Sequence, residues 1–183
     1  MRKIMLIVFA AILCFCGCAS EKSDKANPEK KVQSNAVRDN SSYKNVLDNF
    51  YKAYEKCDAK YQMATFSPQY KNYVMKTYGY SDEKTMQENL QDVISSLYTQ
   101  YQTAADGDFE IIYEVESEKT LTPDEVTALE NEMEGQYGGE FKIISAVSVK
   151  VKASVIGQSE GRGIGENEFT FALLDDENWY ILK

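Results

Sequence analysis

Histidine is absent from this 183-residue sequence, proline occurs only three times and tryptophan once. Without imidazole, the chain lacks the commonest general acid and base at neutral pH and the commonest nitrogen ligand for metals. Cys14, Cys16 and Cys18 lie close together but have no partner residues that could complete a zinc site. We therefore expect no metal and no other cofactor.

Basic residues are also few, with 20 Lys and Arg against 29 Asp and Glu and a formal net charge of -9. Nucleic acid is an unsuitable partner for such a chain, because its affinity for proteins depends on Lys and Arg contacts to phosphate. Long apolar runs are missing too. A membrane-spanning helix needs about 20 apolar residues, and the run from Ile4 to Phe15 is shorter.

That apolar run has the features of an export signal. Arg2 and Lys3 precede it, which is the charge-then-hydrophobe order of a secretory signal peptide. It is followed by Cys16, Gly17, Cys18 and then two small residues.

This ending resembles the lipobox of bacterial lipoproteins, in which the first mature residue is a cysteine that carries a diacylglyceryl group. The resemblance implies a signal peptide at 1–17, lipidation of Cys18 and a position on the outer face of the cell membrane. One position differs from the pattern, since Phe15 stands where Leu is usual; Leu13 would suit a cut before Cys16 but would place Phe15 at a position that requires a small residue. A signal peptide with incidental cysteines is the alternative interpretation.

Residues 18–42 contain few apolar side chains and mix both signs of charge. Such a segment cannot bury enough surface to offset the entropy of ordering. We predict a lipidated cysteine and flexible tether without fixed packing against the domain that follows. The domain then occupies residues 43–183.

The first half of this domain shows helical periodicity. Apolar and aromatic residues recur at spacings of three and four from Tyr43 to Tyr61, which predicts one helix with Ser41 or Ser42 as its cap and places Cys57 on its apolar stripe. Cys57 has no disulfide partner in the exported chain, and a core role is favoured over a reactive thiol. Helices are also predicted from Ser67-Pro68 to Tyr78 and from Ser81 or Asp82 to Asp106-Gly107.

The second half is dominated by strand patterns. Residues 109–116 alternate with period two, and Thr122, Pro123 and Glu125 predict a capped helix over 122–137. Long alternating runs follow at 141–155 and 169–173, and a turn leads into the closing "WYILK". Helices followed by mostly antiparallel strands predict an α+β fold with one extra helix between the first two strands.

The charges on these strands also predict their pairing. Glu114 and Glu116 share the wet face of the first strand, while Lys150 and Lys152 have the same spacing on the second. We predict that the two strands are adjacent and antiparallel, with Glu114 near Lys152 and Glu116 near Lys150. All carboxylates of the first strand are expected on its wet face.

The order of these elements over residues 43–183, together with the closing "NWYIL", resembles the NTF2-like (cystatin-like) superfamily and in particular the small lipoproteins of Gram-positive bacteria. The resemblance implies helices packed on a curved sheet to form a cone with an internal pocket. Such pockets serve binding in some members, catalysis in others and assembly in others, so the fold alone does not identify the function.

Four aromatic residues are candidates to line that pocket, namely Tyr54, Tyr98, Tyr113 and Trp179. Core filling is the alternative role for the same side chains. The inward strand positions are otherwise aliphatic or aromatic, and we therefore expect no catalysis.

Two further segments allow more than one interpretation. The stretch "GRGIG" at 161–165 joins two strands and opens no helix, which favours a mobile hairpin loop over a phosphate site.

Residues 108–140 hold eleven acidic side chains and only Lys119 as a base. This acidic segment is interpreted as a solvated face, with a surface for a basic protein or for a loosely held divalent cation as the alternatives.

Together these features predict a lipid-anchored extracytoplasmic binding or interaction module of the cell envelope. Its expected partners are the membrane, through Cys18, and either a small apolar ligand or a basic protein. The alternative is an enzyme acting on a small apolar substrate inside the cone.

Overall fold

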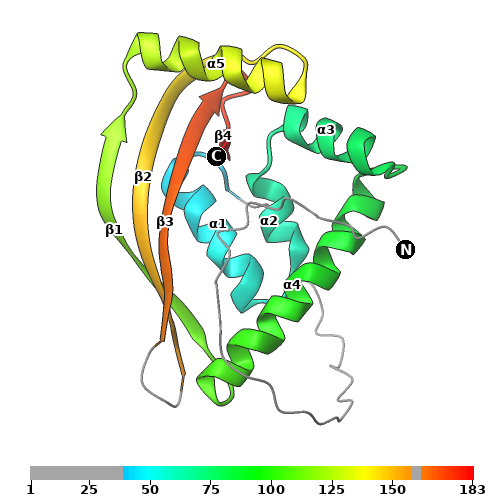
Figure 1. The fold of residues 1–183 in the computed structure, drawn as a ribbon, viewed down its shortest axis with the longest axis vertical. Coiled ribbons are helices and arrows are strands. Elements are labelled where there is room, and N and C mark those ends of the chain that lie inside the picture. Colours follow the sequence, from blue (N-terminus) through cyan, green and yellow to red (C-terminus); the bar gives the residue numbers. More distant parts are fainter. Residues whose placement is uncertain (1–38, 158–161) are drawn as a thin grey trace. The chain divides into compact units, whose positions relative to one another are not determined.

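A computed structural model of the chain describes residues 39–157 and 162–183, with only the backbone of 162 and 163 described. The predicted signal peptide, Cys18 and the predicted tether up to residue 38 lie outside the described residues. The elements in chain order are α1 (Tyr43–Glu55), α2 (Ala59–Thr65), α3 (Pro68–Tyr78), α4 (Glu83–Ala105), β1 (Glu110–Thr120), α5 (Pro123–Tyr137), β2 (Ile143–Ile156), β3 (Arg162–Leu174) and β4 (Trp179–Ile181). The strands form an open antiparallel sheet in the order β1-β2-β3-β4 (Figure 1). The α+β prediction is confirmed, and so is the helix between the first two strands.

The helices begin where the sequence places capping residues. The side chains of Ser42, Ser67 and Asp82 each accept a hydrogen bond from the backbone N–H three residues later. Thr122 and Glu125 form the predicted capping box at the start of α5. These side chains satisfy backbone donors that have no partner inside the helix, which is why local sequence sets the start of each helix.

The helix predicted from Tyr43 to Tyr61 is in fact two helices, so that prediction is wrong. The chain leaves α1 after Glu55, and Cys57 adopts a left-handed conformation with φ of 49°. Asp58 then caps α2 by accepting from the N–H of Lys60. Cys57 consequently lies half-buried in the connecting turn, with its Sγ 3.5 Å from the hydroxyl of Ser95.

α1 covers one face of the curved sheet, and α2 and α4 lie on the side of α1 that faces away from the sheet (Figure 1). Aromatic rings make this contact: Phe50 of α1 lies 5.1 Å from Phe169, and Tyr43 lies 5.5 Å from Phe171. Phe171 is completely buried. Burial of each such ring contributes about 1.5–3 kcal/mol relative to an exposed position, so this layer is a main source of stability.

α5 lies across one end of the sheet (Figure 1). The strand residues that pack against it alternate with those that contact α1, so they lie on the opposite face of the sheet. Leu129 and Met133 of α5 form one buried cluster with residues on β2, β3 and the end of the chain, including Ala146, Ala172 and Leu182. Small alanines on the sheet leave space for the larger side chains of the helix. The end of the sheet near β4 is therefore packed on both faces.

β1 and β2 are adjacent and antiparallel, as predicted, and Glu114 lies opposite Lys152. The predicted Glu116 to Lys150 pairing is wrong because a β-bulge at Glu116 shifts the register, and Ser117 stands opposite Lys150. The extra residue also reverses the alternation beyond it. As a result Glu118 lies opposite the buried Val149 on the face that α1 covers, which corrects the prediction that all carboxylates of this strand are on the wet face.

β3 begins at Arg162, so most of the "GRGIG" stretch forms the start of a strand and the loop prediction is wrong for residues 162–165. Gly157 ends β2 against the last turn of α4. A Cβ atom at this glycine would lie 2.4 Å from the Cβ of Ala105, so only glycine fits this close approach.

Candidate functional site

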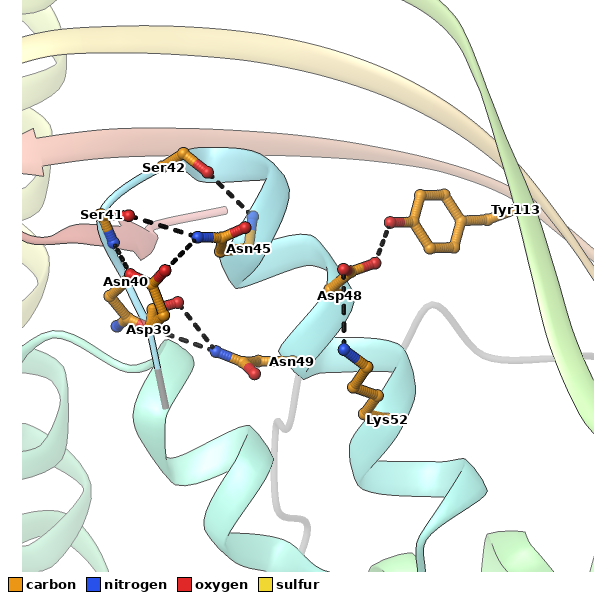
Figure 2. A network of polar contacts seen from close by, with 9 residues as sticks. All are labelled: Asp39, Asn40, Ser41, Ser42, Asn45, Asp48, Asn49, Lys52 and Tyr113. Carbon is orange, nitrogen blue, oxygen red and sulfur yellow. Dashed lines mark hydrogen bonds and ion pairs between the residues drawn. The ribbon is translucent and has the colours of Figure 1, made fainter. Parts of the chain in front are cut away.

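A line of tyrosine and carboxylate side chains joins α1 to the edge strand β1. The hydroxyl of Tyr113 donates to Asp48 Oδ1, and the hydroxyl of Tyr43 donates to Glu118 Oε2. Lys52 Nζ lies 3.7 Å from the other oxygen of Asp48. Figure 2 shows Tyr113 pointing from β1 toward Asp48, with Lys52 one turn further along α1. We call these residues the α1–β1 seam.

The seam is partly open to solvent, since the side chains of Asp48 and Lys52 are 45% and 46% exposed. Burial, and then the neighbouring Asp48 carboxylate, raise the pKa of Tyr113 well above its ordinary value. Burial and Glu118 together raise the pKa of Tyr43 to about 12. Both phenols therefore keep their protons at neutral pH and act as hydrogen-bond donors, which excludes them as general bases there.

The residues just before α1 are fastened to the domain (Figure 2). Asn40 is 9% exposed; its Nδ2 donates to the carbonyl of Ala64 at 2.6 Å, and its Oδ1 accepts from Asn49 at 3.3 Å. Asp39 accepts from the backbone N–H of Ser41 at 2.8 Å. The prediction that the segment up to residue 42 is free of the domain is therefore wrong for residues 39–42.

The four predicted pocket residues occur in one continuous set of packed rings. Tyr54 is buried between Phe50 and Tyr101, and Tyr101 contacts Phe109, which in turn contacts Tyr98. Tyr113 stacks on Tyr51 with ring centroids 4.8 Å apart, and Trp179 lies against Tyr43 at 6.0 Å. These contacts are ring against ring within the layer that α1, α4 and the sheet enclose.

A surface pocket of about 680 Å³ lies instead between α3 and the C-terminal end of α5. α3 contributes Gln69, Asn72, Tyr73, Lys76 and Thr77, and α5 with its following turn contributes residues 136–139. We call it the α3–α5 pocket. None of the four predicted lining residues is part of it.

The sequence analysis missed this pocket because its two walls are separated by more than fifty positions along the chain. A signal was nevertheless present. α3 is rich in tyrosine and amide side chains and contains no acidic residue, although the chain as a whole is acidic.

Several carboxylates of the acidic segment 108–140 have specific structural partners. Glu130 and Glu134 accept hydrogen bonds from the backbone N–H groups of Ile143 at 2.7 Å and Phe141 at 3.0 Å, which joins α5 to the start of β2. The ammonium of Lys119, and then the backbone N–H of Thr122, lower the pKa of Glu125 to about 2. Part of the acidic excess therefore stabilises the local fold.

Among the described residues, no group of three or more Cys, Asp or Glu side chains is placed to hold a metal ion. Within the same residues, none of the helices has the length and apolar character to cross a membrane. Comparison of the chain with protein-family models, with curated proteins and with solved structures found no match.

Proposed function

We propose that the chain is a lipid-anchored extracytoplasmic binding or interaction module of the cell envelope. In this proposal residues 43–183 form an NTF2-like domain, and a diacylglyceryl group on Cys18 holds it at the outer face of the membrane. The α3–α5 pocket carries the binding part of the proposal, because it is a hollow lined by hydrogen-bonding side chains that contains no acid-base pair.

The domain architecture supports the NTF2-like part. Helices precede an open antiparallel sheet, and α1 lies along one face of its curve (Figure 1). Packed aromatic rings occupy the space between α1 and the sheet. A ligand is therefore better accommodated at the surface, in the α3–α5 pocket, than inside a cone.

The acidic segment 108–140 supports a basic protein as a second kind of partner. It includes strand β1 and helix α5, which follow each other along the chain, and the β1 side chains beyond Tyr113 are exposed. Charge complementarity would raise the association rate of such a partner at low salt.

An enzyme acting on a small apolar substrate is the second candidate, and one observation favours it. Tyr113 and Asp48 form a hydrogen-bonded pair at the α1–β1 seam, and such pairs can exchange protons with a substrate. The raised pKa of Tyr113 opposes this role, because the phenol neither accepts nor readily releases a proton near pH 7. We therefore propose binding without catalysis.

The anchoring part is tested by replacing Cys18 with Ala in the full chain, with Cys16→Ala as the matched control. We expect Cys18→Ala to abolish labelling by a radioactive or clickable fatty acid and to release the protein from sedimented membranes, while Cys16→Ala retains both. If Cys18→Ala still labels and still sediments with membranes, the anchoring proposal is rejected.

A further inference from the structure

The walls of the α3–α5 pocket present three side-chain amides. Gln69, Asn72 and Gln136 all line it, and each amide carries both hydrogen-bond donors and an acceptor. Gln69 is held in place by donating from Nε2 to the carbonyl of Glu140 at 3.2 Å. A ligand that is purely apolar would leave such groups without partners, whereas a ligand with many hydroxyl groups can donate to them and accept from them.

Two aromatic rings form a corner of the same pocket. The rings of Tyr73 and Tyr137 are 5.2 Å apart and inclined at 54° to each other. Tyr70 supports Tyr137 by an edge contact at 5.2 Å. The two rings thus offer inclined apolar surfaces that packing has already positioned, so little ordering is needed on binding. The C–H face of a pyranose ring packs well against such a surface, with its hydroxyls directed toward the amides.

The charge of the lining narrows the ligand class further. No carboxylate lines the pocket although α5 is strongly acidic, and Lys76 is the one ionic side chain among the lining residues. The pocket also lies at the C-terminal end of α5, where the helix dipole is negative and the last carbonyls need donors. These features disfavour a polyphosphate and suit hydroxyl groups.

The turn after α5 adds backbone groups to the site. Gly138 and Gly139 have φ angles of 72° and 82°, in the left-handed region, and no atom lies within 4 Å of the position of a Cβ at either residue. The absence of side chains leaves this stretch of backbone open toward the pocket.

From these observations we infer that the α3–α5 pocket binds a neutral saccharide. The inference deepens the proposed binding function, on which it rests, by naming the ligand class. The amides and backbone carbonyls recognise the hydroxyls, and Tyr73 and Tyr137 contact the sugar ring.

The test uses the full chain in detergent micelles and isothermal titration calorimetry. The probes are linear tetrasaccharides of glucose with α-1,4 links, glucose with β-1,4 links and N-acetylglucosamine, with ATP and octalysine as probes of other classes. We expect at least one tetrasaccharide to bind, and ATP and octalysine not to bind at this site. Tyr73→Ala should weaken saccharide binding about tenfold or more, and Gln136→Ala about threefold to tenfold.

Matched variants control for general effects. Gln100→Ala removes an exposed glutamine from α4, far along the chain from the pocket, and Tyr98→Phe removes a hydroxyl elsewhere on α4. Both should leave saccharide binding unchanged, whereas Tyr137→Ala should weaken it because it removes a ring that contacts the sugar. Circular dichroism checks that each variant is folded. If Tyr73→Ala does not fold, Gln136→Ala tests the pocket in its place, because Gln136 is exposed.

Three results would overturn the inference: no tetrasaccharide binds, the saccharide affinity does not respond to the pocket variants, or ATP or octalysine binds in a way that Gln136→Ala abolishes. Fractionation of the same protein separates this from a failure of the proposed function. Membrane retention that depends on Cys18, without saccharide binding, would reject the ligand class and leave the anchored module standing. Saccharide binding with retention that is independent of Cys18 would reject the anchor and leave the pocket standing.

Discussion

The two edges of the sheet are protected in different ways. β4 is only three residues long, and neighbouring chain covers it: the N–H of Trp179 donates to the carbonyl of Asn40 at 2.9 Å, and Ile181 forms a parallel bridge with Phe66. β1 is eleven residues long and lies at the opposite edge of the sheet, and nearly all of its residues beyond Tyr113 are exposed.

The difference shows two physical solutions to the same problem, since an open edge can pair with another chain. The β4 edge is closed by the hydrogen bond between Trp179 and Asn40 and by the bridge between Ile181 and Phe66. The β1 edge relies on like charges, at Glu110, Glu114 and Glu116, and on the bulge, which disrupts regular pairing. We therefore expect side chains near β4 to contribute more to the free energy of unfolding than side chains on β1. The contacts of β1 are mainly with β2 and with the α1–β1 seam.

The largest expected effect comes from truncating one apolar side chain to alanine near each edge. Leu182, adjacent to β4, is 2% exposed in the cluster with α5, whereas Val115 on β1 is 37% exposed. Leu182→Ala should lower the free energy of unfolding by about 2–5 kcal/mol because it leaves a cavity, and Val115→Ala by less than about 1 kcal/mol. Urea unfolding measures both. Equal losses in the free energy of unfolding would contradict the expectation that the β4 edge contributes more to stability than the β1 edge.

A smaller effect is expected from the seam that ties β1 to α1. The pKa of Tyr43 is raised from 10.0 to about 12 in the folded state. The stability from this group is complete below pH 10 and is lost as the pH rises from about 10 toward 12, because the unfolded chain ionises first. Tyr43→Phe should cost about 1 kcal/mol at pH 7, through loss of the hydrogen bond to Glu118.

The same variant should also lose less stability than the wild type between pH 10 and pH 12. The measurement is urea unfolding at a series of pH values. Tyr98→Phe, which removes a phenol hydroxyl from α4 and not from the α1–β1 seam, is the control. An unchanged alkaline profile in Tyr43→Phe would show that the seam does not couple to folding.

The smallest effect concerns charge pairing on the wet face. Lys152 lies between Glu114 on β1 and Glu166 on β3, while the bulge removes Glu116 from the partner position of Lys150. A double-mutant cycle with Glu114→Gln and Lys152→Gln should show a coupling of about 0.2–1 kcal/mol. The cycle with Glu116→Gln and Lys150→Gln should be additive. Coupling in the second cycle and not in the first would place the bulge elsewhere.

The local elements were predictable because their signals are local. Ser42, Ser67, Asp82 and Thr122 each mark the start of a helix, since a side-chain oxygen can satisfy only the backbone donors within a few residues of it. The α+β class and the adjacency of β1 and β2 followed from the periodicity and from the charge pattern. The break at Cys57 was not predicted, because the apolar stripe continues in phase across it.

The candidate site was largely beyond sequence analysis. The α3–α5 pocket depends on how two distant helices approach each other, and no periodicity within α3 or α5 records that approach. The Tyr43 to Glu118 contact depends on one extra residue in β1, which reverses the alternation after Glu116. Alternation read along the sequence cannot reveal a bulge, because the partner strand determines which residue is left unpaired.

By itself, the sequence determined the capped helices, the alternating strands and the fold class, because capping and amphipathic patterns act over a few neighbouring residues. Its composition also made nucleic acid an unsuitable partner. Only the tertiary structure decided that residues 39–42 are part of the domain, that Glu118 faces α1, and that α3 and α5 approach each other to form a pocket. These features arise when segments far apart in the chain compete for the same buried surface. The side chains that fill the interior, here the linked aromatic rings, determine where a hollow can remain.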